Sequence, residues 1–426
     1  MIAARRLTTD SAVPRTQGAS RGRAVALCLA FASLCASGAS AQRAGLSSPG
    51  NTGEAGLGQS TRYDNEFNPA ISLALDLLYD WKEIEGSDQD GLKLDLRRVD
   101  LLLADWIDPN ALAWVTIAYE EDELGLDEAA IEYVGLPGNH TLRGGRFFVD
   151  FGKQMQSHVE SLRTIDRPLV LREFLGEELA GDGLQWDNWF AVGEATMVRY
   201  SLGAFADLSG GHHVHGAAGT DEPELHVDDR KRADELGFTG RLSALTEVGA
   251  NGTLQLGASG RFLGDFAFEH EGSELEQSGQ SNAVYGLDLT YAWVDDTGLK
   301  SWTGGGEFLL FDGDLGAELD DGGTPANAAD DALDITRGSV SGAYIFADRA
   351  WNANESAGIQ YSTIEEPRAG EPRAQEYDLY YTRQLSEYLR LRIGVGYTDR
   401  EAGLDSTRVG IQLTGFIGPH GHGLNW

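Results

Sequence analysis

Apolar and polar positions alternate along most of the chain. In residues 389–397, LRLRIGVGY, every odd position is apolar and every even position is arginine or glycine. Residues 253–262 and 285–293 repeat this alternation. A period of two is that of a β-strand, whose successive side chains point to opposite faces of its sheet. Each such strand is therefore predicted to separate an apolar medium from an aqueous one.

Sixteen segments of roughly 10 residues are predicted to be strands, with 14 or 18 strands as the alternatives. They lie at about 70–81, 94–106, 110–120, 126–136, 141–150, 183–191, 195–207, 236–246, 252–264, 283–294, 301–312, 335–347, 356–364, 376–385, 388–399 and 406–417. The chain has 55 Gly, 9 Trp and 14 Tyr but only 11 Pro, which is typical of an all-β fold. A single sheet of so many strands must curl, split or close.

The connections between these strands differ in length according to their parity. Connections at one end are predicted at 82–91, 120–125, 151–182, 208–235, 265–282, 313–334, 365–375 and 400–405, and most of them are long. Those at the other end, at 108–110, 137–139, 191–194, 247–251, 295–300, 348–355 and 384–387, are short. Long connections at one end of the strands, here called the elaborated end, and short turns at the other are typical of a transmembrane antiparallel β-barrel. A closed barrel also satisfies its backbone hydrogen bonds within hydrocarbon. The alternative is a soluble sandwich, in which the apolar faces pack together.

The first 41 residues are predicted to be a signal peptide for export, cleaved near Ala41. Five arginines precede the apolar run 24–36, which is shorter than the roughly 20 residues that a membrane helix needs. Residues 42–68, polar and rich in Gly and Ser, are predicted to be a flexible leader, and 69–426 the barrel domain. Both cysteines, Cys28 and Cys35, lie in the signal peptide.

The chain is strongly acidic. Its formal charge is −34, and loss of residues 1–41, with five arginines and one aspartate, changes this to −38. Such a charge argues against nucleic acid as a partner. The Asp-rich connection 313–334 fits no calcium-binding loop. It is interpreted as a solvated surface that faces lipopolysaccharide.

Four segments resemble outer-membrane porin-like proteins related to the phosphate-selective porin O/P group. They are FNPAISLALDLLYDW (67–81), DEAAIEYVGLPGNHTLRGGRFFVDFGK (127–153), DRPLVLREFLGEELAGDGLQW (166–186) and TRVGIQLTGFIGPHGH (407–422). The resemblance is strongest between residues 127 and 186. It implies a barrel in the outer membrane of a Gram-negative bacterium that passes small solutes without an energy source.

The connection 151–182 has an apolar centre that a solvent-exposed loop would not need. It is the third connection at the elaborated end, and in porins the third outer loop folds into the lumen and narrows it. The constriction would then present Arg163, Asp166, Arg167, Arg172, Glu173, Glu177 and Glu178. The alternative is a short helix or plug that packs for stability while these charges are only solvated.

If the leucine and aromatic faces contact lipid, the arginines of the same strands face the lumen. An arginine on the lipid side would cost roughly 2–4 kcal/mol at mid-membrane. The predicted wall residues are Arg199, Arg241, Arg261, Asp288, Arg390, Arg392 and Arg408. Arginines in a narrow lumen favour anions, but Asp288 balances part of this charge and only five lysines follow residue 41. We therefore predict a weakly selective pore.

Four histidines, His212, His213, His215 and His226, share one connection with several acidic residues. Imidazole and carboxylate ligands suit Zn²⁺ and similar ions, so this connection is a weak candidate for a metal site. The spacing matches no closed four-ligand site, and the alternative is a polar loop that tolerates histidine. No cofactor is predicted.

The sequence therefore predicts an outer-membrane porin and not an enzyme, since no catalytic Ser/His/Asp arrangement stands out. It would let small hydrophilic solutes, anions among them, diffuse through a homotrimer. Its partners would be outer-membrane lipid, lipopolysaccharide and the barrel-assembly machinery, which reads a terminal aromatic such as Trp426. The alternative is a receptor barrel that binds metal ions or another small ligand without active gating, because 42–68 is too short for a plug domain.

Overall fold

The computed structural model describes residues 69–85, 90–120, 123–208, 223–226, 232–233, 235–270, 276–320, 332–367, 370 and 372–418. The predicted signal peptide and leader lie outside these residues. The strands are β1 (Ala70–Ile84), β2 (Gly91–Asp108), β3 (Ala111–Glu120), β4 (Glu123–Tyr133), β5 (His140–Phe148), β6 (Ala180–Val192), β7 (Thr196–Asp207), β8 (Pro223–His226), β9 (Gly237–Val248), β10 (Gly252–His270), β11 (Glu276–Val294), β12 (Ser301–Asp320), β13 (Ala332–Asn352), β14 (Glu355–Glu365), β15 (Arg373–Ser386), β16 (Leu389–Arg400) and β17 (Ser406–Ile417).

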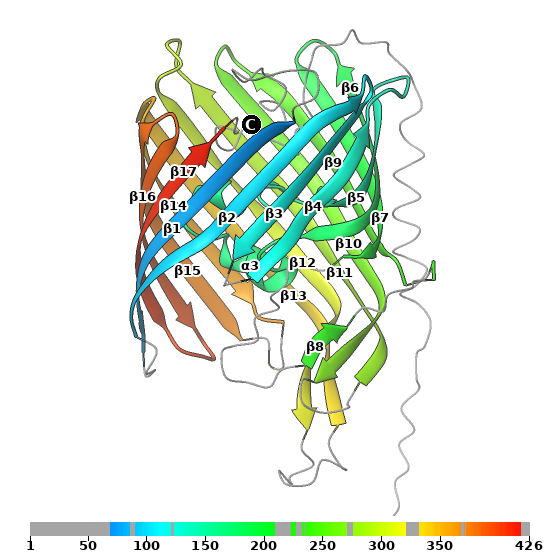
Figure 1. Ribbon diagram of the computed structural model, residues 1–426. Helices are drawn as coiled ribbons and strands as arrows, with labels where there is room; N and C mark the ends of the chain where they lie inside the picture. Colours follow the sequence, from blue (N-terminus) through cyan, green and yellow to red (C-terminus); the bar gives the residue numbers. More distant parts are fainter. Residues whose placement is uncertain are drawn as a thin grey trace, which may run out of the picture. The chain divides into compact units, whose positions relative to one another are not determined.

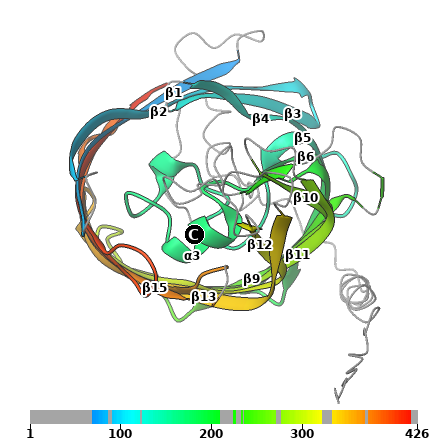
Figure 2. The same cartoon turned by 90° about the horizontal axis from the view of Figure 1, so that it is seen from below.

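The strands form one closed antiparallel ring (Figure 1 and Figure 2). β1 pairs with β2 on one side and with β17 on the other, so the first and last strands join. β7 pairs directly with β9, while the short β8 pairs with the far end of β10. Without β8 the ring has sixteen strands, and each corresponds to one of the predicted segments. The predicted 16-strand antiparallel barrel is thus confirmed.

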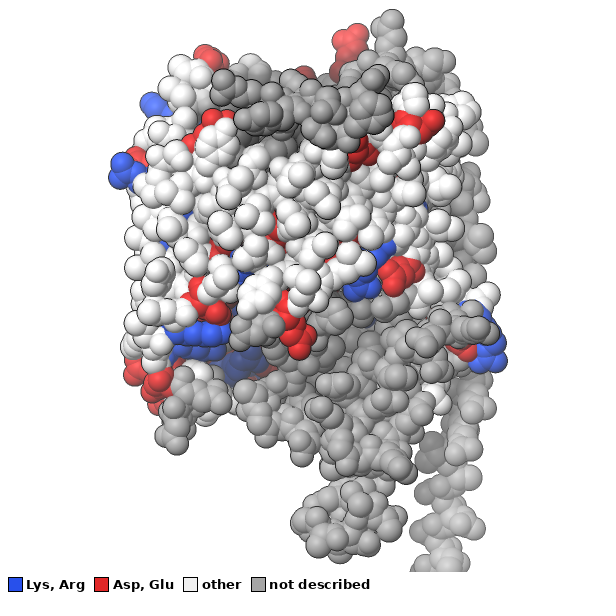
Figure 3. Space-filling view, viewed as in Figure 1, with Lys and Arg blue, Asp and Glu red and all other residues white. Residues whose placement is uncertain are grey.

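The two faces of the strands differ in chemistry. On β11, Leu287 and Leu289 are 62% and 46% exposed, whereas Asp288 and Thr290 are 6% and 4% exposed. An uncharged band crosses the outer face, and most of the charged side chains visible there lie nearer to its two ends (Figure 3). Apolar residues outside and polar residues buried inside are the reverse of a soluble protein. The exterior therefore faces hydrocarbon, and the interpretation as a soluble sandwich is wrong.

The two longest connections lie at one end of the barrel and several tight turns at the other, as predicted. At one end β2–β3, β6–β7 and β13–β14 are joined by the tight turns 109–110, 193–195 and 353–354. At the other end β5–β6 and β7–β9 are joined through 149–179 and 208–236.

In two of the predicted loops, 265–282 and 313–334, the described residues are strand. They belong to β10, β11, β12 and β13, which continue beyond the rest of the ring as long hairpins (Figure 1). Their polar composition suggested loops, but Phe266, Phe268, Phe311 and Leu315 are buried and give the hairpins an apolar inner face. Strand β8 also lies in a predicted loop, 208–235, and pairs with the end of one of these hairpins.

In the part of the chain that the structure describes, helix is limited to the connection between β5 and β6. It comprises the 3₁₀ turn η1 (Val159–Ser161) and the short helix α3 (Leu169–Leu175). Among the residues that the structure describes, no helix is long and apolar enough to span a bilayer.

Leu289→Arg tests the assignment of the outer face. The variant places a guanidinium in hydrocarbon midway along the membrane part of β11, so the free energy of folding into lipid vesicles should become less favourable by about 2–4 kcal/mol. Urea titration of the folded, heat-modifiable form measures this change. Leu289→Ala adds no charge and should cost much less; equal losses for the two variants would contradict a lipid-facing Leu289.

Candidate functional site

Residues 149–179, here called the lumen segment, lie inside the ring (Figure 2). Their apolar side chains form a core with side chains of the inner wall. The Phe174 and Phe311 rings, for example, meet edge to face with centroids 5.5 Å apart. Buried members of this core from the lumen segment are Val149, Phe151, Met155, Leu169, Val170, Leu171, Phe174, Leu175 and Leu179. This packing explains the apolar centre that the sequence showed.

Wall side chains fix the start of α3. The first N–H groups of a helix lack partners within the helix. Here the Leu169 N–H donates to Glu376 Oε1 at 3.1 Å, and the Val170 N–H donates to Ser362 Oγ at 3.2 Å. The helix ends at Gly176, whose φ of 81° is a conformation that favours glycine.

Hydrogen bonds also join the lumen segment to strands on opposite sides of the ring. The Gly152 N–H donates to Ser259 Oγ of β10 at 3.0 Å, and the Lys153 N–H donates to Glu307 Oε1 of β12 at 2.9 Å. Opposite them, Arg97 of β2 donates to the Ile165 carbonyl at 2.7 Å. The segment is thus bonded to strands on several sides and crosses the lumen.

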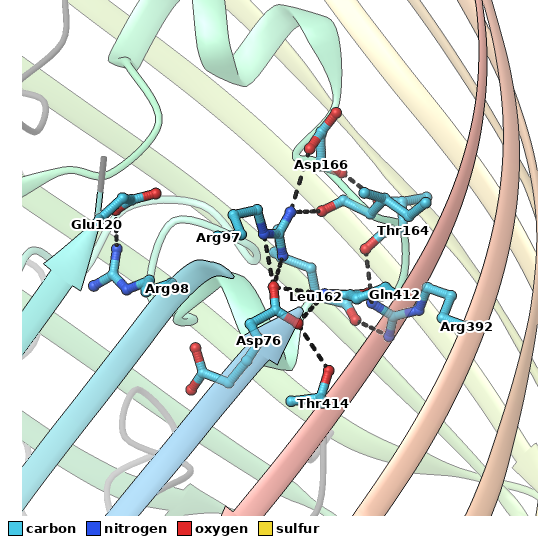
Figure 4. A network of polar contacts seen from close by, with 12 residues as sticks. Asp76, Arg97, Arg98, Glu120, Leu162, Thr164, Asp166, Arg392, Gln412 and Thr414 are labelled. Carbon is cyan, nitrogen blue, oxygen red and sulfur yellow. Dashed lines mark hydrogen bonds and ion pairs between the residues drawn. The ribbon is translucent and has the colours of Figure 1, made fainter. Parts of the chain in front are cut away.

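Two predicted wall residues hold the backbone of the lumen segment. Arg392 donates to the carbonyls of Leu162 and Thr164, the latter at 2.9 Å (Figure 4). Arg390 donates to the carbonyl of Glu160. Both side chains are buried on the inner face, so their donors serve the fold of the segment.

The buried carboxylate of Asp76 organises the neighbouring wall (Figure 4). It accepts hydrogen bonds from Arg97 Nε at 2.6 Å, from Gln412 Nε2 at 2.9 Å and from Thr414 Oγ1 at 3.0 Å. Beside it, Arg408 pairs with Asp80 at 2.5 Å and with Asp166 of the lumen segment.

The other predicted wall residues also lie on the inner face and have partners. Arg199 pairs with Asp150 at 2.8 Å and with Asp187. Arg241 pairs with Asp288 at 2.6 Å.

Arg261 differs from these two arginines. It donates to the neutral Asn282 Oδ1 at 2.5 Å. The predicted wall therefore carries mainly ion pairs and arginines bound to neutral oxygens.

Arg167, predicted to face solutes, is fully buried within the lumen segment. Its guanidinium donates to the carbonyls of Gln154, Ser157 and Glu177 and so ties the two halves of the segment together. A guanidinium with these bonds is a structural tie, and sequence alone could not distinguish it from its neighbours.

The remaining predicted constriction residues lie at the contact between segment and wall. Arg172 pairs with Glu376, Glu173 with Arg400 at 2.9 Å, and Glu178 with Arg98 at 3.0 Å. Arg163 lies 3.9 Å from Asp348 and over the Phe346 ring, and the Glu177 carbonyl accepts from Arg167. Asp166 and Glu173 keep about a third of their side chains exposed, at 33% and 31%.

Sequence reasoning missed Arg97 and Arg98, two of the most connected side chains. Consecutive arginines on a strand would normally point to opposite faces, so one would meet lipid. A β-bulge after Asp76 of β1 leaves Arg97 unpaired in the register, and both arginines turn inward. Two consecutive arginines in an alternating strand could have indicated this bulge, because an arginine that faces lipid is costly.

The predicted metal candidates fall on residues whose side chains the structure does not describe. His212, His213 and His215 lie outside the described residues, as does the side chain of His226 in β8 (Pro223–His226).

Lys153 of the lumen segment is poised to titrate near neutral pH. Burial, together with the positive charges of Arg241 and Arg163, lowers the pKa of Lys153 to about 8. Its Nζ donates to Gln255 Oε1 at 2.9 Å.

Glycines on the wall form the seat for the tip of the lumen segment. A Cβ on Gly394 would lie 2.8 Å from Ile165 Cδ1, and a Cβ on Gly410 would lie 2.5 Å from the same atom. Both distances are too short for carbon atoms, so a side chain at either position would push Ile165 Cδ1 from its place against β16 and β17.

Comparison with known proteins supports the fold. No protein-family model matches the chain. An uncharacterized protein of Aquifex aeolicus is 28% identical over 276 residues, which are 63% of this chain and 54% of that protein, so the chain spans about half the length of the curated relative it matches.

Two solved structures share the architecture. OmpT of Vibrio cholerae, an outer membrane protein folded in vitro, matches 84% of this chain and 100% of its own, with a TM-score of 0.50 and 9% identity. The outer membrane channel DcaP of Acinetobacter baumannii matches 83% of this chain and 99% of its own, with a TM-score of 0.50 and 11% identity. At these identities the likeness concerns the fold alone, which is that of an outer-membrane β-barrel.

Gly394→Ala combined with Gly410→Ala should displace the tip of the lumen segment. Because the two new methyl groups occupy the place of Ile165, we expect a loss of about 1–3 kcal/mol in stability and faster trypsin cleavage at Arg163. Adding Ile165→Ala should restore resistance. Gly415→Ala is the control, since its Cβ meets nothing nearer than 4.0 Å. If this control were cleaved as fast as the double variant, the two glycines would not be what positions Ile165.

Proposed function

We propose that the protein is a porin-like channel of the outer membrane through which small hydrophilic solutes diffuse. One observation carries this proposal: a closed ring of strands has a hydrocarbon-facing exterior and an inner face of buried polar and charged residues. Such an interior offers polar solutes the hydrogen bonds that they lose on leaving water. No reaction centre is needed for this role, and we propose none.

The lumen segment would act as the constriction. It crosses the lumen between bonded contacts on β10, β12, β2 and β16. Its partly exposed carboxylates, Asp166 and Glu173, lie beside Arg408 and Arg400. A solute that passes here would meet charges of both signs at close range.

Selectivity between anions and cations should be weak. Arg199, Arg241 and Arg408 are each neutralised by carboxylates within bonding distance. A dedicated phosphate channel would require several arginines or lysines free to bind the anion. Small anions would therefore pass among other hydrophilic solutes, and we do not propose phosphate as a specific substrate.

The surroundings of such a channel follow from its surface. We propose contacts with outer-membrane lipid around the apolar band and with lipopolysaccharide at the elaborated end. Assembly as a homotrimer, and insertion by the barrel-assembly machinery, belong to the same proposal.

Conductance in planar lipid bilayers tests the function. Purified protein should give stepwise currents in KCl. Arg392→Gln removes donors to the Leu162 and Thr164 carbonyls, so the lumen segment should loosen and the single-channel current should become larger or noisier. Arg261→Gln is the matched control, because it removes the same wall charge but its partner is Asn282.

Two outcomes would count against the proposal. Wild-type protein that is folded but passes no current would favour a binding barrel over a channel. The same currents in Arg392→Gln and Arg261→Gln would remove the lumen segment as the constriction.

The pKa of Lys153 gives a second test. At pH 7 the lysine is charged, so Lys153→Met removes one positive charge and should reduce anion preference, read as a shift in reversal potential across a KCl gradient. Above the pKa of about 8 the wild-type side chain is neutral. The difference between wild type and variant should therefore vanish by about pH 9.5. A difference that stays constant from pH 7 to this value would show that Lys153 does not influence permeation.

A further inference from the structure

A group of acidic residues lies where the lumen segment meets β2, β3 and β4. Here called the acid cluster, it consists of Asp100, Glu120, Asp127, Glu128, Glu160 and Glu178, together with His158. One ligand atom from each of Asp100, His158 and Glu160 lies within 4.8 Å of the other two. The same holds for Asp127, His158 and Glu178, so His158 belongs to both triads.

One arginine neutralises only part of this cluster. Arg98 pairs with Asp100 at 2.8 Å, with Glu120 at 2.9 Å, with Glu178 at 3.0 Å and with Asp127. Four carboxylates share this single guanidinium, and Glu128 and Glu160 add two more. Arg98, Asp100, Glu128 and Glu160 are all at least nine-tenths buried. Carboxylates removed from water without an equal positive charge are costly.

Two atoms in the cluster have no hydrogen-bond partner. Glu160 Oε2 is buried and unpartnered, and so is His158 Nδ1. The other ring nitrogen, His158 Nε2, lies 3.4 Å from Glu128 Oε2. A histidine that binds a metal commonly donates its second N–H to a carboxylate in this way.

The position of Glu128 and His158 is itself fixed. Glu128 Oε1 accepts the Phe148 N–H at 3.2 Å, and the Phe148 ring stands edge-on to the imidazole at 4.6 Å. The carboxylate therefore orients the ring and leaves Nδ1 as the available ligand atom.

We propose that Asp100, His158 and Glu160 bind a divalent transition-metal cation, for which Zn²⁺ is the probe. An imidazole with two carboxylates suits Zn²⁺ better than Ca²⁺ or Mg²⁺, which prefer oxygen ligands alone. Ligand atoms of a tetrahedral Zn²⁺ site are about 3.3 Å apart, given bonds of about 2.0–2.1 Å. Small side-chain rotations close the triad to this size, and water completes the coordination.

A cation there joins wall and lumen segment. Asp100 belongs to β2, whereas His158 and Glu160 belong to the segment, whose Glu160 carbonyl also accepts from Arg390. Occupancy should therefore stiffen the segment. The site itself does not depend on transport, so it stands or falls separately from the proposed channel.

Calorimetric titration of the metal-stripped full chain in detergent tests the site. Wild type should bind Zn²⁺, and His158→Gln and Glu160→Gln should each weaken binding by at least about 100-fold. Glu128→Gln, which alters only the positioning carboxylate, should weaken it by about 10–100-fold. His140→Gln is the matched control, since its imidazole stacks on Trp186 of β6. Heat-modifiable migration confirms that each variant is folded.

A spectroscopic readout separates a ligand from a structural residue. Co²⁺ should give a visible absorption band in wild type and in His140→Gln but not in His158→Gln. A combined His212→Ala, His213→Ala and His215→Ala variant should keep both the band and the Zn²⁺ affinity. No binding by folded wild type, unchanged affinity in His158→Gln, or loss of binding in the triple variant would each overturn the proposal.

Discussion

Closure between β1 and β17 is the constraint on which the rest of the structure depends. In hydrocarbon an unpaired backbone N–H or C=O costs several kcal/mol, so a sheet with a free edge could not lie in a bilayer. The continuous register from Leu73↔Ile417 to Ile84↔Ser406 removes that edge. Once the ring is closed, every strand has one face toward lipid and one toward the lumen. The period of two in the sequence follows from this geometry.

The closed ring creates a second requirement, because its inward side chains are removed from bulk water. A guanidinium has five N–H donors to satisfy, and the wall does not provide a carboxylate for each of them. Arg390 and Arg392 use carbonyls of the lumen segment instead. The wall arginines thus determine the backbone path of the lumen segment, and the carbonyls of the segment satisfy the hydrogen-bond donors of those arginines. If either the arginines or the carbonyls were removed, buried polar groups would be left unpaired. This cost keeps the lumen segment in one position against the wall.

The fold could be predicted from the sequence because it depends on a local pattern repeated sixteen times. The period of two identified each strand of the ring, and the parity of connection lengths gave the closed barrel. The long hairpins were missed, since polar residues at 265–282 conceal the alternation of Phe266 and Phe268. The roles of single charges could not be read, because they depend on contacts between distant residues. Arg167 and Arg172 look alike in sequence, yet one binds carbonyls of its own segment and the other Glu376 of β15.

The distribution of charge across the lumen matters more than its sum. Arg390, Arg392 and Arg261 donate to neutral oxygens, which satisfy their hydrogen bonds without forming an ion pair. The acid cluster on β2, β3 and β4 shares one arginine and is negative as a whole. Arginines without an ion-pair partner lie on β10 and β16, and excess negative charge lies near β2, β3 and β4, so charges of both signs surround the lumen, where low-dielectric surroundings strengthen their fields. Charges of both signs give little net preference between anions and cations, so weak ion selectivity and a strongly charged interior are compatible.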